Sequence, residues 1–212
     1  MKSLFGLAFA VALILSVQPA FGQQPAQPEA VKLVKPQTTG GKPLMQALNE
    51  RRSQRAFSSK ELPPQVLSNL LWAAFGVNRP DGRRTAPSAS NRQEIDIYVA
   101  MARGLYLYNA KEHRLDPVLA EDIRTVTGAE RLVKDTPVVL VFVADYARMS
   151  GNKDLYSATD TGYISQNVYL YCASEGLATV VLGTVNREAL AGRMKLRPDQ
   201  KIILTQPVGY PK

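Results

Sequence analysis

Residues 136–143, TPVVLVFV, predict the central strand of this protein. Apolar side chains fill the run almost without interruption, and valine, which favours extended backbone, is its commonest residue. A run of this kind is typical of a strand that is buried on both faces. We therefore expect residues 136–143 to lie in the middle of a sheet.

Three more strands are predicted around this one. In residues 94–102, EIDIYVAMA, and in residues 104–110, GLYLYNA, apolar positions alternate with polar or aromatic positions, as in a half-buried strand. The Arg103-Gly104 pair suits a tight connection between them. Residues 202–208 form the last predicted strand.

Helical periodicity marks four segments among these strands. The first covers residues 43–52, and the second follows Pro63-Pro64 and ends at Gly76, for which we expect a left-handed backbone. The longest helix is predicted at residues 158–175, where small side chains indicate close packing against another helix, and a short one at residues 186–194. Because helices and strands mix without a regular alternation, the fold class is α+β.

The composition excludes several kinds of site. The chain has one cysteine, Cys172, and one histidine, His113, which argues against an internal disulfide and against a zinc site of the usual ligands. His113 lies in a polar stretch, KEHRLDP, that reads as a loop and argues against a serine-type triad. We interpret Cys172 as a small buried apolar residue rather than a redox thiol.

Residues 1–22 have the pattern of a secretory signal, with Lys2, a short apolar run and a cleavage site after Gly22. An uncleaved membrane anchor is the alternative. Cleavage removes one of the 26 basic residues and none of the 18 acidic ones, which leaves a net charge of +7. We expect a secreted, periplasmic protein that has no stable membrane insertion after cleavage and no nucleic-acid partner.

The remaining chain divides into two parts. Residues 23–42 are rich in Gln, Pro and Gly and poor in large apolar side chains, so we interpret them as a flexible lead or linker. Residues 43–212 are long enough for one domain with a core of its own.

Three arginines lie within five positions of residues 49–57, NERRSQRAF. Like charges at this spacing repel one another unless an anion gathers them, and guanidinium groups match phosphate oxygens with paired donors. The alternative is that the arginines favour the C-terminus of the preceding helix through its dipole.

Three segments, in order, resemble the nitroreductase family of FMN-dependent oxidoreductases. They are RRSQRAF at 51–57, RTAPSASNRQEIDIYV at 84–99 and EGLATVVLGTVN at 175–186. The resemblance covers residues 43–211 and implies a central mixed, largely antiparallel sheet flanked by helices. The loop PSA, with GLYLYNAKEHRL downstream, leans toward the SagB-like branch, which oxidises thiazoline and oxazoline rings in modified peptides.

The resemblance also implies an FMN site. The residues that it assigns to the cofactor are Arg51, Arg52, Ser53, Arg55, Pro87, Ser88, Ala89, Asn91, Leu182, Gly183 and Lys212. The arginine segment would hold the phosphate, Asn91 the pyrimidine edge, and the backbone at Leu182 and Gly183 the region of flavin N5. Ordinary turn chemistry is the alternative for the loop and for Gly183. Two departures are Leu182, where many members have Glu, and the early chain end at Lys212.

From the resemblance we expect an exported, homodimeric oxidoreductase with FMN at the subunit interface. Hydride or electrons would pass through flavin N5 to or from a small organic substrate (a nitroaromatic, quinone or heterocycle) with ping-pong kinetics and no catalytic side chain. NAD(P)H is scarce outside the cytoplasm, so the electron donor stays open. A non-catalytic protein that binds FMN or another ligand on this scaffold is the alternative, and a basic surface-binding module ranks last.

Overall fold

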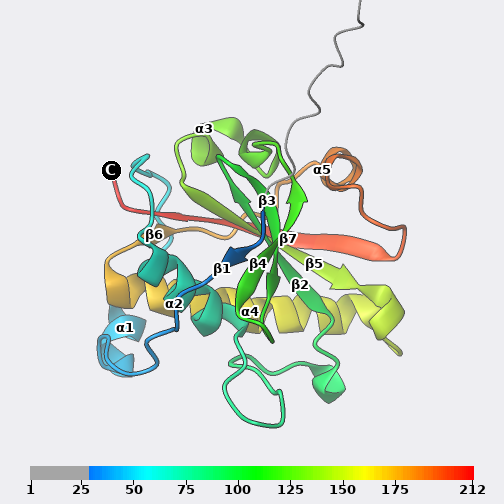
Figure 1. Cartoon of the computed structure of the whole chain (residues 1–212), viewed down its shortest axis with the longest axis horizontal. Helices are drawn as coiled ribbons and strands as arrows, with labels where there is room; N and C mark the ends of the chain where they lie inside the picture. Colours follow the sequence, from blue (N-terminus) through cyan, green and yellow to red (C-terminus); the bar gives the residue numbers. More distant parts are fainter. Residues whose placement is uncertain (1–28) are drawn as a thin grey trace, which may run out of the picture.

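A seven-stranded sheet forms the centre of the structure, a computed structural model that describes residues 29–212 (Figure 1). Every strand pairing is antiparallel, in the order β1-β4-β3-β2-β5-β7-β6. The strands are β1 (Val31–Lys32), β2 (Ile95–Met101), β3 (Gly104–Asn109), β4 (Arg114–Leu119), β5 (Val138–Asp145), β6 (Ala178–Thr179) and β7 (Gln200–Gly209). The α+β class with a largely antiparallel sheet is confirmed, whereas the predicted signal at residues 1–22 lies outside the described residues.

Strand β5 is the buried centre that the sequence predicts. Every residue in Val138–Asp145 is buried, because β2 and β7 pair with its two edges and helices cover its two faces. Leu140 and Phe142 pack in the core that includes α2 and α4, whereas Val141 packs in the core that includes α3 and α5. The two-residue period of a strand therefore divides its side chains between two cores.

Helices lie on both sides of the sheet in Figure 1. They are α1 (Leu44–Glu50), α2 (Pro64–Phe75), α3 (Glu130–Val133), α4 (Lys153–Glu175) and α5 (Arg187–Met194), with short 3-10 turns η1 (Ala89–Asn91), η2 (Arg124–Val126) and η3 (Tyr146–Arg148). Helix α4 begins five residues earlier than predicted, because the Asn152 side chain caps its first turn by accepting a hydrogen bond from Leu155 N–H. It ends at Gly176, whose φ of 68° is left-handed, as in a typical helix C-terminus.

The structure corrects two predictions about local conformation. Gly76 does not adopt a left-handed backbone, since its φ is −73°. Glycine is required there for space, because a Cβ atom would lie 2.5 Å from the Trp72 ring. Strand β4 was not predicted, because its residues around Pro117 are polar and read as a loop; it forms because β3 pairs with one of its edges and β1 with the other.

Part of the predicted flexible lead belongs to the sheet. Val31 and Lys32 pair with Leu115 and Arg114 of β4, and the Leu33 side chain is buried in the core beside α2. The composition of this segment did not predict a strand, because the segment is mostly polar. Two backbone pairings and one buried apolar side chain are nevertheless enough to attach it to the sheet. No helix of residues 29–212 combines the length and the apolar character that a bilayer span requires.

Candidate cofactor site

The arginine segment lies on the surface directly after α1. Arg52 and Arg55 are exposed, and Arg51 is half-buried with its Cζ 5.4 Å from the centre of the Tyr169 ring. Within residues 29–212, none of the three guanidinium groups forms an ion pair. Their charges are therefore available to an anion from outside the chain.

A cavity of about 440 Å³ opens beside this segment. Of the predicted cofactor residues, Arg51 and Arg52 line it, together with Gln54, Lys42 and the last turn of α4, whereas Ser53, Gly183 and Lys212 lie outside its lining. Lys42 is neutralised locally by Glu50, whose carboxylate lies 2.5 Å from the Lys42 Nζ. The two arginines consequently supply the excess positive charge at the wall of this cavity, which has the volume of a typical small-molecule site.

Tyr169 of α4 connects the arginine segment to the segment around Gly183. Its hydroxyl lies 2.9 Å from the Ser53 hydroxyl and accepts a hydrogen bond of 2.9 Å from Val181 N–H. Gln54 N–H also donates to Thr179 O, at 2.9 Å. Two residues of chain reach at most about 7 Å, so Ser53 Oγ and the Gly183 nitrogen lie within about 13 Å of each other.

Leu182 and Gly183 differ in what their backbones offer. Leu182 N–H donates to Thr205 O at 2.8 Å, so this donor is already used within the chain. Gly183 is exposed, and its N–H has no acceptor within the described part of the chain. Of the two predicted backbone donors, only Gly183 is free to meet a ligand.

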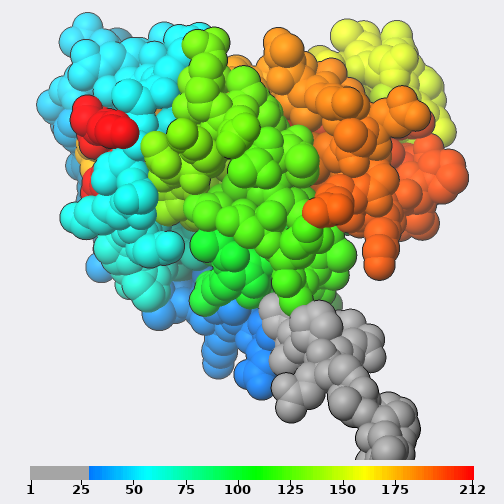
Figure 2. Space-filling view, turned by 90° about the horizontal axis from the view of Figure 1, so that it is seen from above, coloured from blue at the N-terminus to red at the C-terminus, as the bar shows by residue number. Residues whose placement is uncertain are grey.

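The chain end lies beside the arginine segment, where Figure 2 shows the red C-terminal residues among the cyan ones. Pro211 pairs with Phe57, and Lys212 N–H donates to Ala56 O at 3.3 Å. The Lys212 ammonium is exposed and lies 3.9 Å from Asp135 Oδ2. The structure therefore brings Lys212 close to the arginines, although a weak ion pair directs its side chain toward Asp135.

The loop of residues 87–93 has an unusual backbone. Ser90, Asn91 and Gln93 all have positive φ values, of 54°, 53° and 50°, which residues other than glycine rarely adopt. Gln93 N–H donates to Ser88 Oγ at 2.9 Å, and Ala89 N–H donates to the Asp160 carboxylate at 2.8 Å. Pro87 and Asn91 are exposed, so the loop presents its tip to the outside.

One chain does not bring this loop to the arginines. Asp160, which holds the loop, and Tyr169, which holds the arginine segment, lie nine positions apart on α4, or about 14 Å along the helix axis. The predicted cofactor residues thus form two groups. Arg51 to Arg55, Gly183 and Lys212 make one, and residues 87–91 make the other.

Sequence reasoning missed the polar side chains of α4 that support both groups. Asp160 is 3% exposed and Tyr169 is 8% exposed. A signal for Asp160 was present, since it shares the helical phase of the buried Ser157, Ile164 and Val168. An acid on the apolar face of a helix calls for a specific partner. For Tyr169, nothing near it in the sequence identifies its partners.

The residues that sequence analysis set aside have structural roles in the described chain. His113 is half-buried, with Nε2 2.7 Å from Ser68 Oγ and Nδ1 3.1 Å from Tyr108 Oη, and burial lowers the His113 pKa. The Ser68 hydroxyl is fully buried and donates to Val34 O, so it is engaged within the fold. Cys172 is buried as predicted, and no group of metal-binding side chains occurs in residues 29–212.

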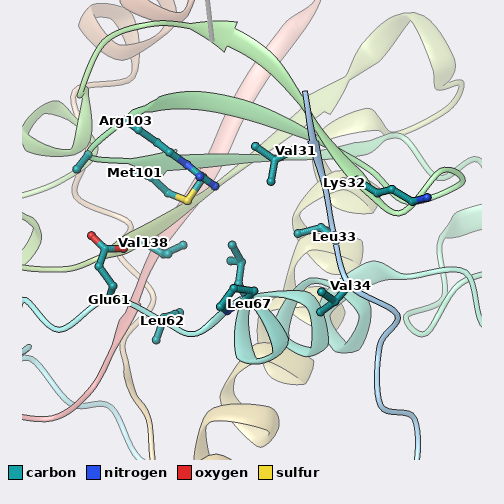
Figure 3. A pocket seen from close by; sticks show the side chains of 12 residues that line it. Val31, Lys32, Leu33, Val34, Glu61, Leu62, Leu67, Met101, Arg103 and Val138 are labelled. Atoms are coloured by element: carbon teal, nitrogen blue, oxygen red, sulfur yellow. The ribbon is translucent and has the colours of Figure 1, made fainter. Parts of the chain in front are cut away.

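A separate apolar cavity of about 410 Å³ lies between β1, α2 and the β2–β3 turn (Figure 3). Leu33, Leu67 and Met101 are among its walls, with Arg103 and Glu61 near its rim. None of the predicted cofactor residues lines this cavity.

Comparisons with known proteins agree with the geometry. A family model described as the nitroreductase family matches residues 48–210. A predicted nitroreductase of Methanocaldococcus jannaschii is 31% identical over 180 residues, which cover 78% of this chain and 90% of that protein.

Solved structures give the same result. A crystal structure of a predicted nitroreductase from Ralstonia eutropha is 41% identical, with a TM-score of 0.83, and the match covers 93% of this chain and 99% of that chain. A nitroreductase-like protein of Desulfovibrio desulfuricans, solved in complex with FMN, has a TM-score of 0.61. That match covers 81% of this chain and 88% of the other, and at 22% identity it shows a common fold alone.

Proposed function

Because the chain belongs to the nitroreductase family, we propose that it is a flavin-dependent oxidoreductase whose cofactor is FMN. The observation that carries this proposal is the cavity of about 440 Å³ with the unneutralised Arg51 and Arg52 in its wall. An FMN phosphate carries close to two negative charges, and guanidinium groups satisfy its oxygens with charged hydrogen bonds. The residues present therefore fit the group.

The described residues suggest how FMN would be held. Arg51, Arg52 and Ser53 would bind the phosphate, with Arg55 and Lys212 adding positive charge nearby. The isoalloxazine would extend toward Gly183, which lies within reach of a molecule of this length. When bound, FMN supplies hydride or electron transfer at its ring. The free N–H of Gly183 would stabilise negative charge that develops near N5, in a site with no side chain that acts as a nucleophile.

We propose that a second copy of the chain completes the site. The loop of residues 87–91 lies about 14 Å along α4 from the arginine segment, so a single chain leaves the flavin in contact with only one group. A two-fold axis that crosses α4 would place the partner's loop opposite the arginines. The outward face of α4 suits this contact, because it is exposed and free of charge at Leu155, Thr159, Gly162, Tyr163 and Gln166.

We also propose a compartment and a substrate class. The N-terminal pattern supports export to the periplasm, where a quinone, a redox protein or the substrate itself would reduce the flavin in place of NAD(P)H. An oxidised partner, such as a nitroaromatic, a quinone or a heterocycle, would then react at the same face in ping-pong order. Membership of the SagB-like branch stays a prediction.

A flavin carrier without turnover is the second candidate. The observation that favours it is Leu182, which replaces the carboxylate found before the glycine in many members and whose N–H is occupied by Thr205. This rival predicts binding of FMN without catalytic transfer of electrons.

Two measurements separate these candidates. FMN is added to the purified protein, which is then desalted and examined for flavin absorbance near roughly 450 nm, a property of the flavin itself. Absence of these bands would end the flavin proposal. If flavin is retained, anaerobic reduction followed by mixing with a nitroaromatic or a quinone gives fast, multiple-turnover reoxidation in an enzyme and none in a carrier.

A further inference from the structure

Glu94 has an unusual environment beneath the loop of residues 87–93. It is 0% exposed, and neither of its carboxylate oxygens meets a hydrogen-bond donor among residues 29–212. A buried carboxylate without donors is costly to keep ionised. Such a group either binds something or holds its proton.

Arg148, a cation that faces Glu94, forms no ion pair with this carboxylate among the described residues. The Arg148 guanidinium lies 2.7 Å from the Asp96 carboxylate and 3.3 Å from that of Asp145. It also donates to the backbone carbonyl oxygens of Gln93 and Glu94. Its donors are thus directed to the backbone and to other acids.

The group that Glu94 does meet is the carboxyl of Asp160 on α4, itself 3% exposed. Burial, followed by this neighbouring acid, raises the pKa of Glu94 to about 7. Two ionised carboxylates repel each other, whereas a protonated one donates a hydrogen bond to its neighbour. Below about pH 7 the Glu94 carboxyl is therefore protonated and donates a hydrogen bond to the Asp160 carboxylate, which two ionised carboxylates could not form.

The same Asp160 holds the loop. Its Oδ2 accepts the Ala89 N–H at 2.8 Å and so ties the loop to α4. The other bonds inside the loop are local, among them those from Gln93 N–H to Ser88 Oγ, from Asn91 N–H to Ser88 O and from the Gln93 amide to Asn91 Oδ1. Ser90, Asn91 and Gln93 each hold a left-handed backbone that costs free energy. A loop strained at three positions depends on the contacts that fix its ends.

We propose that Glu94 and Asp160 share one proton, and that this proton keeps the loop of residues 87–93 in the conformation that binds flavin. The inference rests on the proposed function and adds a form of regulation to it. Of the charged groups that face Glu94, Asp160 comes from α4 and Arg148 from η3. Loss of the proton places two negative charges together, displaces Asp160 from Ala89 N–H and releases the loop.

The direct test is the pH dependence of FMN affinity in the wild type and in Glu94→Gln. Glutamine has the same shape, donates to Asp160 and cannot ionise. Between about pH 7 and about pH 8.5 the phosphate is already almost fully ionised, since its second pKa is about 6. We expect the wild-type Kd to rise several-fold over this range and the variant Kd to stay constant. Parallel curves for the two proteins would overturn the proposal.

A second variant and a second measurement test the same proposal without relying on Glu94→Gln alone. In Asp160→Asn, the side-chain amide both accepts from Ala89 and donates to an ionised Glu94, so the pH dependence of Kd should again disappear. Infrared spectroscopy of the flavin-free wild type should show a protonated carboxyl band that titrates near pH 7 and is absent from Glu94→Gln.

These readouts also separate the inference from the proposed function. If no form of the protein binds FMN at any pH but the infrared band is present, the flavin assignment fails and the shared proton stands. If FMN binds but the wild type has no such band, the shared proton is wrong and the flavin assignment stands.

Discussion

The hydroxyl of Tyr169 lies 2.9 Å from the hydroxyl of Ser53, and it also accepts a hydrogen bond from Val181 N–H. One side chain of α4 thereby joins the arginine segment to the segment that leads from β6 to Gly183. These two segments are separated by more than a hundred residues of sequence, and their distance in space decides whether one cofactor spans them. Tyr169 is a positioning residue for the candidate site.

We expect Tyr169→Phe to weaken FMN binding. The change removes both hydrogen bonds and leaves Val181 N–H without its acceptor, with a cost of about 1–3 kcal/mol shared between folding and binding. FMN titration monitored by flavin fluorescence, together with thermal unfolding, measures the two parts. Tyr171→Phe is the matched control, because Tyr171 is on the same helix and its hydroxyl donates to Val66 O of α2 instead of to the arginine segment. Equal effects of the two substitutions would show that the Tyr169 hydroxyl has no special role.

Arg52→Ala should weaken FMN more than it changes the fold. Loss of one charged hydrogen bond corresponds to about 1.5–3 kcal/mol, or roughly a ten- to hundredfold rise in Kd. Thermal stability should change little, because Arg52 is exposed. Arg83→Ala is the control, since Arg83 is also exposed but pairs with Asp81 in a distant loop. An unchanged Kd in Arg52→Ala would indicate that this guanidinium faces solvent in the complex.

The outward face of α4 provides a test of the homodimer. A Cβ atom at Gly162 meets nothing within 4 Å, so Gly162→Glu should fold as a monomer. The added charge should nevertheless prevent two copies from packing across α4, and FMN binding should be lost with the dimer. Light scattering after size exclusion reports the mass.

Gly192→Glu is a close match for that variant, because Gly192 is also helical and a Cβ there is equally unobstructed. It should remain dimeric and bind FMN. A dimeric Gly162→Glu would place the interface elsewhere.

Glu94 should make the folded state less stable as pH rises. Its folded pKa is raised from 4.5 to about 7, so the folded protein binds more protons than the unfolded chain between these values. The unfolding free energy should therefore fall from about pH 4.5 to about pH 7 by on the order of 2–3 kcal/mol and then level off. Urea unfolding at a series of pH values measures this.

In Glu94→Gln this decrease should be absent, while the opposite contribution of His113 persists. Burial lowers the His113 pKa, so that residue reduces stability as pH falls below its ordinary 6.5. If the variant keeps the full wild-type decrease toward neutral pH, another group is responsible.

The local sequence determined the elements whose signals are local. Periodicity and burial follow directly from the side chains, so the buried strand β5, the end of α4 at Gly176 and the class α+β were all predictable. The cluster of three arginines was visible in the sequence for the same reason, whereas its assignment to a phosphate stays a prediction. Strand β4 and the strand at Val31 were not predictable, since both form only because a neighbouring edge offers backbone partners.

The tertiary structure alone decided how the candidate residues are grouped. Sequence order could not indicate that Leu182 N–H is used by Thr205, or that Gly183 is the remaining donor. It also could not indicate that α4 anchors the loop of residues 87–91 and the arginine segment at positions about 14 Å apart along the helix axis. The sequence gives the type of each side chain. It does not give a buried contact such as that of Glu94 with Asp160, because that contact depends on tertiary packing that excludes water from both carboxyls.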